Sequence, residues 1–457
     1  MMQTLENLTA AFASFVWGPP LLLLLLGGGI FFLLYSRGLP YRFLGHSIAI
    51  LTGRFDSKDD PGDLSHFQAL SSALSGTLGL GNIAGVAVAI HVGGPGAVFW
   101  MWMTAIVGIA TKFFTCTLAV MYRGEDSLGR IQGGPMYVIR EALGKRWQPL
   151  AVLFCLAGMI GTLPAFQINQ LTQIARDYIA APNGWVGDNP LWFNLGFGLV
   201  TAVLASAVIL GGVKRIGAFT ARLVPLMVVI YLGAVGFILA QHLPELPGLM
   251  GLIVTEAFMP TAVGGGLLGV IITGVRRGAF SNEAGIGTES MAHGAAKTQE
   301  PIREGLVAML GPAIDTLIVC TATALAILAT GVWQSGEANG VTLTAQAFTT
   351  AMPTMGIWIL ALVVFFFAIS TIITYSYYGT KCLGFIAGAE YEHHYRWFYI
   401  ALIVGGAVVS IDVVLNVIDG MYALMAIPTM TSAIILAPKV MQAARKYFAG
   451  IQQAPNP

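Results

Sequence analysis

The chain has 457 residues, of which 56% are hydrophobic and only 10% are charged, with 23 Lys and Arg against 22 Asp and Glu. A water-soluble domain carries about a quarter charged residues, so this composition excludes a water-soluble protein and predicts a chain that faces lipid. The formal net charge of +1 excludes a nucleic acid or another polyanion held by bulk charge.

Eleven apolar stretches are long enough to cross a bilayer, which takes about 20 residues of helix. In chain order the predicted spans are 16–36, 65–92, 95–122, 148–178, 192–212, 217–242, 250–275, 303–332, 355–388, 397–416 and 419–443. The longest polar stretches, 37–64, 123–147 and 276–302, are predicted to be loops or surface helices. The predicted fold class is therefore an all-α polytopic membrane protein with eleven transmembrane helices and no separate soluble domain.

The basic residues test this count, because the cytoplasmic loops of membrane proteins carry an excess of Lys and Arg. When the loops are assigned alternately to the two sides, all but three of the 23 Lys and Arg fall on one side. Arg176 falls on the other side, and Lys112 and Arg222 fall inside helices. We therefore expect the N-terminus outside the cell and the C-terminal tail, 444–457, in the cytoplasm.

The second span contains the run 75–82, in which three glycines, Gly76 and Gly79 among them, fall near mid-membrane together with Thr77 and Asn82. Glycine weakens a helix, and the two polar side chains need partners at this depth. Unwound backbone is tolerated in a membrane only where it lines a cavity or is buried in protein. Its freed carbonyls can hold a cation, and freed N–H groups can hold a carboxylate.

The seventh span contains three consecutive glycines at 264–266 and is predicted to break in the same way. The second and seventh spans are five apart, so we predict two halves of opposite orientation, 65–242 and 250–443, preceded by one extra helix within 1–64. Paired broken helices in an inverted repeat indicate a transporter site. The alternative is that these glycines only allow tight helix packing.

Several polar side chains fall inside predicted spans. Asp315 and Asp412 are costly there unless each is paired, protonated or bound to a cation, and a structural hydrogen bond is an equal alternative. Ser370 and Thr371 offer hydroxyl oxygens that suit a hard cation such as Na⁺, but they could also bond carbonyls of their own helix.

Gln167 and Gln170 are three residues apart and share one helix face. Two amides that face a bundle interior could bind the ammonium and carboxylate groups of an amino acid. They could equally serve only to join helices.

These residues lie among sequence runs that resemble a family of prokaryotic transporters, the alanine or glycine:cation symporters. The runs are GLGNIAGVA at 79–87, GGPGA at 93–97, GGPMY at 133–137 and RGAFSNEAG at 277–285, the last followed by MAH at 291–293. The likeness extends from about residue 65 to residue 440. It implies a LeuT-like core of ten helices, the second to eleventh spans, as in the amino acid-polyamine-organocation superfamily. It also implies coupling to Na⁺, or less often to H⁺.

By similarity, the carbonyls of Ser75 and Leu78 and the hydroxyls of Ser370 and Thr371 form a Na⁺ site, and we add Asp315 as a candidate cation ligand. The candidate substrate-binding residues are Gly76, Thr77, Gly79, Asn82, Gln167, Gln170, Gly265 and Gly266. A cytoplasmic gate is predicted at 276–298, with Arg277, Asn282 and Glu283 as its candidate residues.

The chain departs from the family pattern at several positions. The family usually has Glu at Thr115, Asn at Gln167 and Thr172, Phe at Gly266, Trp at Tyr375 and Asn at Thr429. Because Gly266 removes a phenyl ring from the expected pocket, we predict a substrate side chain larger than that of alanine.

The sequence thus predicts a Na⁺-coupled symporter of a small neutral amino acid in the cytoplasmic membrane of a bacterium or archaeon. We expect no enzyme activity and no cofactor other than Na⁺ as the coupling ion, and a monomer would suffice. The alternatives are an H⁺-coupled symporter, a channel and a membrane enzyme.

Overall fold

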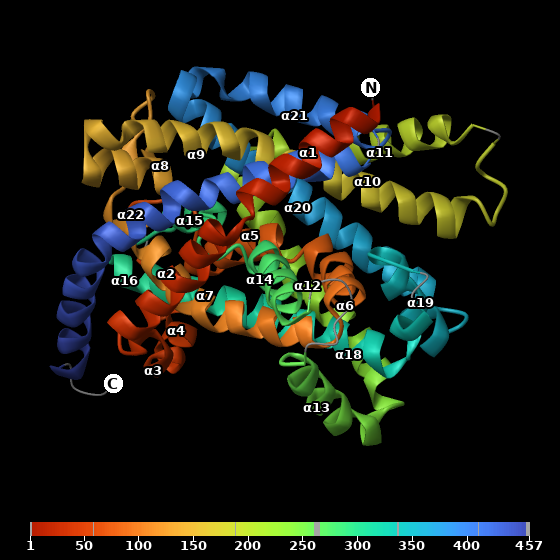
Figure 1. Cartoon of the computed structure of the whole chain (residues 1–457). Coiled ribbons are helices and arrows are strands. Elements are labelled where there is room, and N and C mark those ends of the chain that lie inside the picture. Colours follow the sequence, from red (N-terminus) through yellow and green to blue (C-terminus); the bar gives the residue numbers. More distant parts are fainter. Residues whose placement is uncertain are drawn as a thin grey trace.

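The computed structural model describes residues 2–57, 59–187, 189–259, 266–335, 338–409 and 411–453, and nearly all of them are helical (Figure 1). The described strands are two short ones, β1 (Gly124–Glu125) and β2 (Ile131–Gln132), which pair antiparallel with Gly124 opposite Gln132. The all-α prediction is therefore confirmed for the described residues.

The α-helices of the first half are α1 (Met2–Val16), α2 (Pro19–Tyr35), α3 (Leu39–Arg42), α4 (Leu44–Leu51), α5 (His66–Thr77), α6 (Val86–Gly93), α7 (Gly96–Met121), α8 (Pro135–Val138), α9 (Gln148–Gly161), α10 (Ala165–Ile174), α11 (Pro190–Ile209) and α12 (Gly212–Ala240). Those of the second half are α13 (Leu246–Glu256), α14 (Gly266–Asn282), α15 (Thr288–Gly294), α16 (Pro301–Ala308), α17 (Leu310–Pro312), α18 (Thr321–Ala329), α19 (Val341–Ala351), α20 (Gly356–Ala387), α21 (Glu392–Gly406) and α22 (Ile411–Gln453). The π-helical turns are Gly81–Gly85, Ile139–Leu143, Ala175–Ala180 and Ala313–Cys320, and the 3-10 turns are Lys145–Trp147, Leu243–Glu245, Val332–Ser335 and Ala389–Tyr391.

Eight helices among the described residues are long and apolar enough to cross a membrane, or nine when a bent pair is counted as one span. The eight are Thr4–Tyr35, Gly96–Met121, Lys145–Ala180, Pro190–Ile209, Gly212–Ala240, Pro301–Ala329, Gly356–Ala387 and Asn416–Ile451. The bent pair is α5 with the segment Gly81–Gly93, at an angle of 52°. The expected break of the second span is thus present, whereas the count of eleven spans is not reached by this measure. α21, which overlaps the predicted span 397–416, has only 15 residues.

The predicted seventh span, 250–275, has wrong boundaries. Its first part is α13, an exposed helix in which Ile253 is the buried residue, and α14 begins only at Gly266. α14 then continues through 276–282, which the sequence analysis assigned to a loop or surface helix. These residues can enter the interior because glycines let α14 approach α7 closely. A Cβ on Gly274 would lie 2.4 Å from the carbonyl oxygen of Ala97, and a Cβ on Gly278 would lie 2.1 Å from Oγ1 of Thr104.

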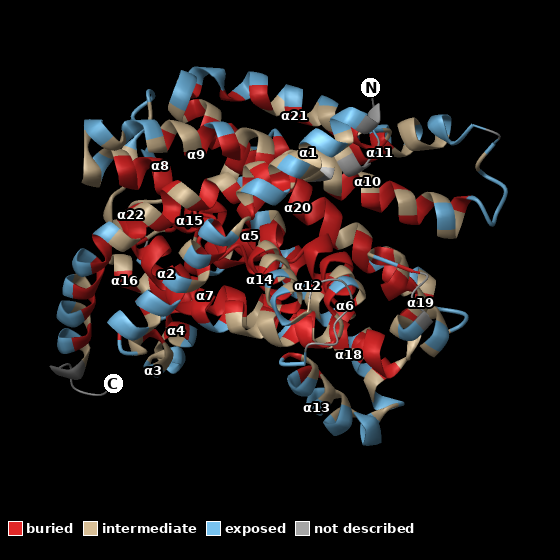
Figure 2. Ribbon diagram, viewed as in Figure 1, coloured by how far each residue is buried: buried red, intermediate tan, exposed pale blue. Residues whose placement is uncertain are grey.

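The centre of the molecule is α7, which is buried along almost its whole length and packs against α2, α14, α15 and α16 (Figure 2). The exposed residues concentrate on peripheral helices such as α1, α11 and α21 (Figure 2). α22 crosses the molecule and packs against α9, α1 and α2. The bent pair α5–α6, the second half of α14 and α15 are therefore enclosed by other helices, whereas the start of α14 is exposed.

The membrane-span candidate Pro301–Ala329 separates two ends of the bundle. Lys297 lies just before this span, and Asn339 and Gly340 lie beyond its other end. Arg276 and Arg277 share a cavity with Asn339 and Gly340, so they lie at the opposite end from Lys297. The prediction of one loop at one membrane face for 276–298 is therefore wrong, as is the assignment of both arginines to the side of Lys297.

Arg123, which follows α7, joins two segments at the Lys297 end. Its guanidinium donates hydrogen bonds to the carbonyls of Gly294 (2.8 Å), Thr298 (2.9 Å) and Pro61 (3.2 Å), and also to that of Ala296. Next to it, backbone bonds join 63–64 to 295–297. The planar guanidinium of Arg123 therefore joins the segment before α5 to the connection between α15 and α16.

We predict that Arg123→Lys destabilises the folded protein by about 2–4 kcal/mol, because one ammonium cannot reproduce the four bonds of a guanidinium fork. Thermal unfolding in detergent measures this loss. The matched control is Arg140→Lys, since Arg140 makes an exposed pair with Glu141 and such pairs contribute at most about 1 kcal/mol. Equal effects of the two substitutions would contradict the role given to Arg123.

Candidate functional site

The second span is interrupted where the sequence is richest in glycine. α5 starts with a capping box at Ser65 and ends at Thr77, and Leu78 leaves the helical conformation with φ −70° and ψ 81°. Gly79 lies against α20: a Cβ at this position would be 2.7 Å from Oγ1 of Thr371 and 3.8 Å from Nε2 of Gln167. The close approach explains why glycine stands at position 79.

Ser75, Ser370 and Thr371 meet at this interruption. The carbonyl oxygen of Ser75 accepts hydrogen bonds from Oγ1 of Thr371 (3.0 Å) and Oγ of Ser370 (3.4 Å). The Ser75 hydroxyl in turn donates to the carbonyl of Ser370 (2.8 Å) and lies 2.8 Å from Oγ1 of Thr374. The Ser370 and Thr371 hydroxyls also bond the carbonyl of Phe367 in their own helix. Both alternatives are therefore present, because these hydroxyls bond their own helix and also converge on Ser75 of α5.

The donor set of this cluster fits Na⁺. It consists of backbone carbonyl and hydroxyl oxygens on two helices, all fully buried, and hard cations bind such oxygens. Leu78, the fourth expected ligand, follows α5 directly and is also buried. The hydroxyl protons that now point at the Ser75 carbonyl would have to turn away when a cation binds.

Asp315 belongs to a different cluster. Its carboxylate accepts hydrogen bonds from Nδ2 of Asn82 (2.6 Å), Oγ of Ser281 (2.7 Å) and Oγ1 of Thr316 (2.8 Å). The structure thus supports the hydrogen-bonded alternative for Asp315 and brings it to Asn82 rather than to Ser370 and Thr371. For Asp412, the side chain lies outside the described residues.

The structure shows an interrupted helix at 283–287, which the sequence did not predict. α14 ends at Asn282 and α15 begins at Thr288, and the left-handed φ values of Glu283 (58°), Gly285 (87°) and Gly287 (102°) turn the chain between them. The two interruptions adjoin, because a Cβ on Gly81 would lie 3.5 Å from the Phe280 ring. The predicted break falls on Gly264 and Gly265, which lie outside the described residues.

A buried polar network surrounds this second interruption. Glu283 accepts a hydrogen bond from the Tyr375 hydroxyl (2.6 Å) and another from Thr288, and the Tyr375 hydroxyl lies 2.9 Å from that of Tyr422. Glu289 is 3.4 Å from Oγ1 of Thr115 and 3.4 Å from Oγ1 of Thr288. Glu283, predicted as part of a surface gate, is therefore an interior residue.

The sequence analysis missed Glu289, Tyr378 and Tyr422. The sequence did contain a signal for Glu289. Between Arg277 and Lys297, Glu283 and Glu289 are the only acidic or basic residues of the types Asp, Glu, Lys and Arg, and the segment is rich in glycine and alanine. That pattern is typical of a membrane segment rather than of a loop. Lys112, buried on α7, is close enough to both glutamates to interact with them electrostatically.

Buried polar atoms near the first interruption lack partners among the described residues. They include Oε1 of Gln167 and the hydroxyl of Tyr378. The Tyr378 hydroxyl lies 3.5 Å from where a Cβ on Gly76 would be, and Gln167 adjoins Gly79. Such atoms cost free energy when unpaired, so this region is ready to bind a polar ligand. The Thr77 side chain is also buried here, and among the described residues its hydroxyl makes only a long bond, 3.4 Å, to the carbonyl of Leu74.

Other predicted substrate residues lie elsewhere. Gln170 bonds Gln173 (3.3 Å) and lines a cavity of about 390 Å³ with Gly81, Phe280 and Arg277. Gly266 starts α14, about 22 Å along the helix from Ser281 at 1.5 Å per residue. It therefore does not lie beside Gly79, and the argument for a larger pocket from Gly266 does not hold. Asn282, whose Nδ2 is unpaired among the described residues, is buried, and its Oδ1 accepts a hydrogen bond from the Ala284 N–H (3.0 Å) just after α14.

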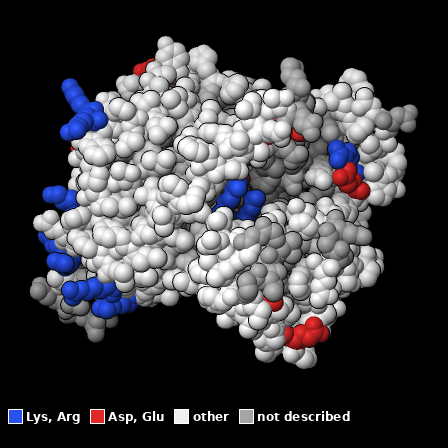
Figure 3. Space-filling model, viewed as in Figure 1, with Lys and Arg blue, Asp and Glu red and all other residues white. Residues whose placement is uncertain are grey.

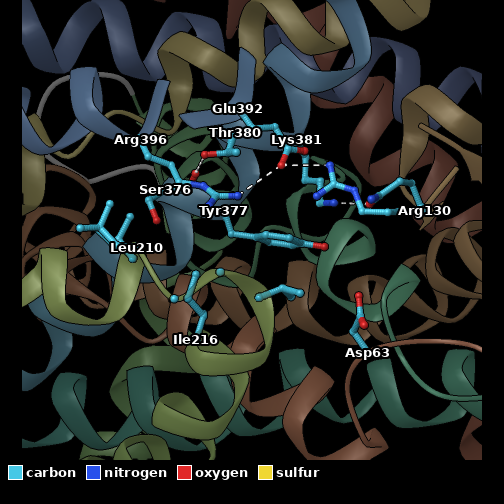
Figure 4. A pocket seen from close by; sticks show the side chains of 15 residues that line it. Asp63, Arg130, Leu210, Ile216, Ser376, Tyr377, Thr380, Lys381, Glu392 and Arg396 are labelled. Carbon is cyan, nitrogen blue, oxygen red and sulfur yellow. Dashed lines mark hydrogen bonds and ion pairs between the residues drawn. The ribbon is translucent and has the colours of Figure 1, made fainter. Parts of the chain in front are cut away.

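A second cavity, of about 250 Å³, lies at the Lys297 end beneath α20 (Figure 4). Lys381 enters it from α20 with its ammonium bonded to Gln132 and 5.4 Å from the centre of the Tyr377 ring. Arg130 and Arg396 reach it from either side and each pair with Glu392 at 3.2 Å (Figure 4). Ser376 and Tyr377 also line it, about two turns of α20 beyond Ser370. Cavities thus approach the two interruptions from opposite ends of the bundle.

Comparison with known proteins agrees with this geometry. The model of the sodium:alanine symporter family matches residues 2–457. The sodium/alanine symporter AgcS of Methanococcus maripaludis is 39% identical over 95% of each chain, and an uncharacterized transporter of Haemophilus influenzae is 38% identical over 97% of this chain and 96% of its own. A probable sodium/glutamine symporter, GlnT of Bacillus subtilis, is 33% identical over 98% of this chain and 91% of its own.

Among solved structures, MhsT in complex with L-phenylalanine superposes with a TM-score of 0.56 at 13% identity, covering 84% of this chain and 99% of that one. This likeness concerns the fold alone. It agrees with the LeuT-like core that the sequence resemblance implied.

We predict that Tyr375→Phe lowers the melting temperature and weakens any stabilisation that added Na⁺ gives together with L-alanine or L-glutamine, the solutes for which two relatives are named. The substitution removes the hydroxyl that joins Glu283 to Tyr422, and an unsatisfied buried group costs about 1–3 kcal/mol. The control is Tyr399→Phe, because the Tyr399 hydroxyl bonds only the carbonyl of Ile372 among the described contacts. If both variants keep full ligand stabilisation, the network around Glu283 does not support the site.

Proposed function

The chain belongs to the sodium:alanine symporter family, and we propose that it couples the entry of a small neutral amino acid to the entry of Na⁺ by alternating access. The observation that carries this proposal is the convergence of the Ser75 carbonyl with the Ser370 and Thr371 hydroxyls beside an interrupted helix. Members of this family are multi-pass membrane transporters of amino acids with sodium, and the coupling ion and substrate of this chain are what we propose.

Na⁺ would bridge α5 and α20 at this cluster. Because its ligands belong to two helices, a bound cation stabilises the arrangement in which those helices are close. The same arrangement presents Gly79, Gln167 and Tyr378 to the substrate. Two ligands that favour one conformation increase each other's affinity, and this coupling is what symport requires.

The buried atoms at the first interruption indicate which groups of the substrate can bind there. Oε1 of Gln167 can accept a hydrogen bond from the α-ammonium group, and the Tyr378 hydroxyl can donate one to the α-carboxylate. An amino acid would thus supply the missing partners of these buried atoms.

The departures from the family pattern gather around the second interruption. Thr115 contacts Glu289, Tyr375 bonds Glu283, and Oγ1 of Thr429 donates to the carbonyl of Ile286 (2.8 Å). We propose that these three positions, with Gln167, set the preferred side chain of the substrate. Since two relatives are named for alanine and for glutamine, both amino acids belong in the test panel, with glycine and serine.

We further propose that the end with Arg130, Lys297 and the C-terminal tail faces the cytoplasm and that the N-terminus lies outside. Figure 3 supports this orientation, since basic side chains gather on the left edge, where α3, α8 and the end of α22 lie in Figure 1. The positive-inside rule assigns such an edge to the cytoplasm. Arg276 and Arg277 would then line the outer cavity.

Eleven spans in two inverted halves remain our proposal for the architecture. Both interrupted helices support it, with the second break moved to 283–287. The shorter helices α14 and α21 would complete the count, because each lies between longer spans. The extra first span and the loop up to residue 64 precede the first half.

H⁺ coupling, a channel and a membrane enzyme are the alternatives. Counterflow in proteoliposomes with a panel of amino acids, at equal pH on both sides and with Na⁺ replaced by choline, separates them. The proposal requires saturable exchange of a small neutral amino acid that depends on Na⁺. Uptake without Na⁺ that follows a pH gradient, or flux that does not saturate, would overturn it.

We predict that the double substitution Ser370→Ala and Thr371→Ala raises the Na⁺ concentration for half-maximal uptake about tenfold or more, because two of the oxygen ligands are lost. The control is the pair Thr201→Ala and Ser206→Ala, whose hydroxyls bond only carbonyls of their own helix in the described structure. An unchanged Na⁺ dependence in the folded α20 variant would remove this site from the mechanism.

We predict that Gly79→Ala abolishes Na⁺-dependent uptake, whereas Gly85→Ala preserves it. The added methyl group at position 79 would lie 2.7 Å from Oγ1 of Thr371, but at position 85 it would meet nothing within 4 Å. Neither glycine has a positive φ, so the backbone accepts alanine at both positions. Equal activities of the two variants would contradict the close contact between the interruption and α20.

A further inference from the structure

Three buried titratable side chains form a cluster outside the site described so far. Glu304 on α16 is bonded to Nδ1 of His293 on α15 at 2.6 Å, and its other oxygen is bonded to Nδ1 of His66 on α5. All three side chains are at most 1% exposed. Together they join α5 and α15, which belong to the two interrupted spans, to the first turn of α16, where the next span begins.

The hydrogen-bond pattern defines where a proton can bind. Both imidazoles present Nδ1 to the carboxylate, so Nδ1 carries the hydrogen in each and Nε2 is the free basic nitrogen. Nε2 of His66 and Nε2 of His293 are buried without a hydrogen-bond partner among the described residues. The described residues contain no group of three His, Cys, Asp or Glu that could hold a metal ion, so the ligand that this triad fits is a proton.

His66 is the member of the triad that lies beside an exposed group. Its Nε2 faces the carboxylate of Asp56 at 3.8 Å, and the Asp56 side chain is 42% exposed. A proton arriving from water therefore passes one exposed carboxylate before it meets the buried imidazole. Other charged or titratable groups act on the triad and its neighbour Arg123; they are Asp60, Asp63, Cys116, Arg303 and Tyr377.

Protonation tightens the cluster. With both histidines neutral, the triad holds one buried negative charge on Glu304. One proton on His66 converts this into an ion pair, and it also adds an attraction to Asp56. Because His66 is on α5 and Glu304 on α16, the pair resists any movement of α5 away from α15 and α16. The Arg123 bonds and the backbone bonds of 63–64 to 295–297 close the same end.

We propose that His66, Glu304 and His293 form a proton-binding latch that holds this end of α5 closed, so that a proton on Nε2 of His66 slows release of the substrate. The inference rests on the proposed function, since it takes the Lys297 end as the side of release. In this proposal the proton on the triad is regulatory, and Na⁺ remains the ion coupled to substrate uptake.

The first experiment measures Na⁺-driven uptake of L-alanine and L-glutamine into proteoliposomes with the same pH on both sides. Wild-type uptake is expected to fall about fivefold from pH 7.5 to pH 5.5, across the range in which histidine titrates. His66→Asn keeps a donor near the Nδ1 position but cannot titrate, and its uptake should change less than about twofold over that range. His46→Asn is the matched control, because His46 is a nearby half-buried histidine bonded to Tyr447, and it should retain the wild-type profile.

A merely structural role would lower uptake of His66→Asn at every pH and leave the shape of its profile unchanged, and that result overturns the proposal. A flat wild-type profile does so as well. Should His66→Asn fail to fold, Glu304→Gln takes its place, with the same flattened profile expected.

The second experiment is independent of transport. In ¹⁵N-histidine-labelled wild-type protein in detergent, one Nε2 resonance should change from the unprotonated to the protonated position between pH 8 and pH 5. It should be absent from His66→Asn and shifted to lower pH in Glu304→Gln. A triad that does not titrate in this range refutes the latch, whereas titration without any Na⁺-driven uptake at any pH refutes the proposed function instead.

Discussion

The structure depends on the requirement that every polar group at membrane depth finds a partner inside the protein. An interrupted helix exposes backbone N–H and C=O groups, and lipid offers nothing to bond them. At the first interruption the Ser75 carbonyl is bonded by two hydroxyls of α20, and Asn82 is bonded to Asp315. At the second, Glu283 is bonded by Tyr375 and Thr288. The interruptions therefore persist only because neighbouring helices carry matching polar groups.

This requirement also explains how binding can control movement. Partners of the first interruption lie on α20 and on the turn Ala313–Cys320, whereas the second interruption is held by α7, α20 and α22. A ligand that replaces some of these internal hydrogen bonds changes which helices are held together. The proposed cation site at Ser75 and α20 and the proposed proton site between α5 and α16 would both act on α5. The same helix can thus respond to two different ions without a direct contact between their sites.

The requirement that buried polar groups have hydrogen-bond partners also limits which substitutions family members can accept. Thr115, Tyr375 and Thr429 each bond a group of the second interruption or its flanks. A substitution at one of them must leave those groups bonded or else change the substrate that completes the bonding. Clusters of departures at such positions are therefore better indicators of altered specificity than isolated ones such as Gly266, which lies far along α14.

The sequence by itself determined the membrane class, the helical fold and the first interruption, because composition, apolar length and glycine runs are local properties. The pairing of that interruption with Ser370 and Thr371 was implied by the family resemblance. The sequence did not locate the second interruption: the triple glycine at 264–266 was the stronger local signal, whereas 283–287 is marked by left-handed φ values that only the packed chain requires. Likewise, Glu283, Glu289 and His293 looked like surface polar residues. Only the tertiary structure decided that they are interior, because partners distant in sequence, such as Tyr375 and His66, make their burial possible.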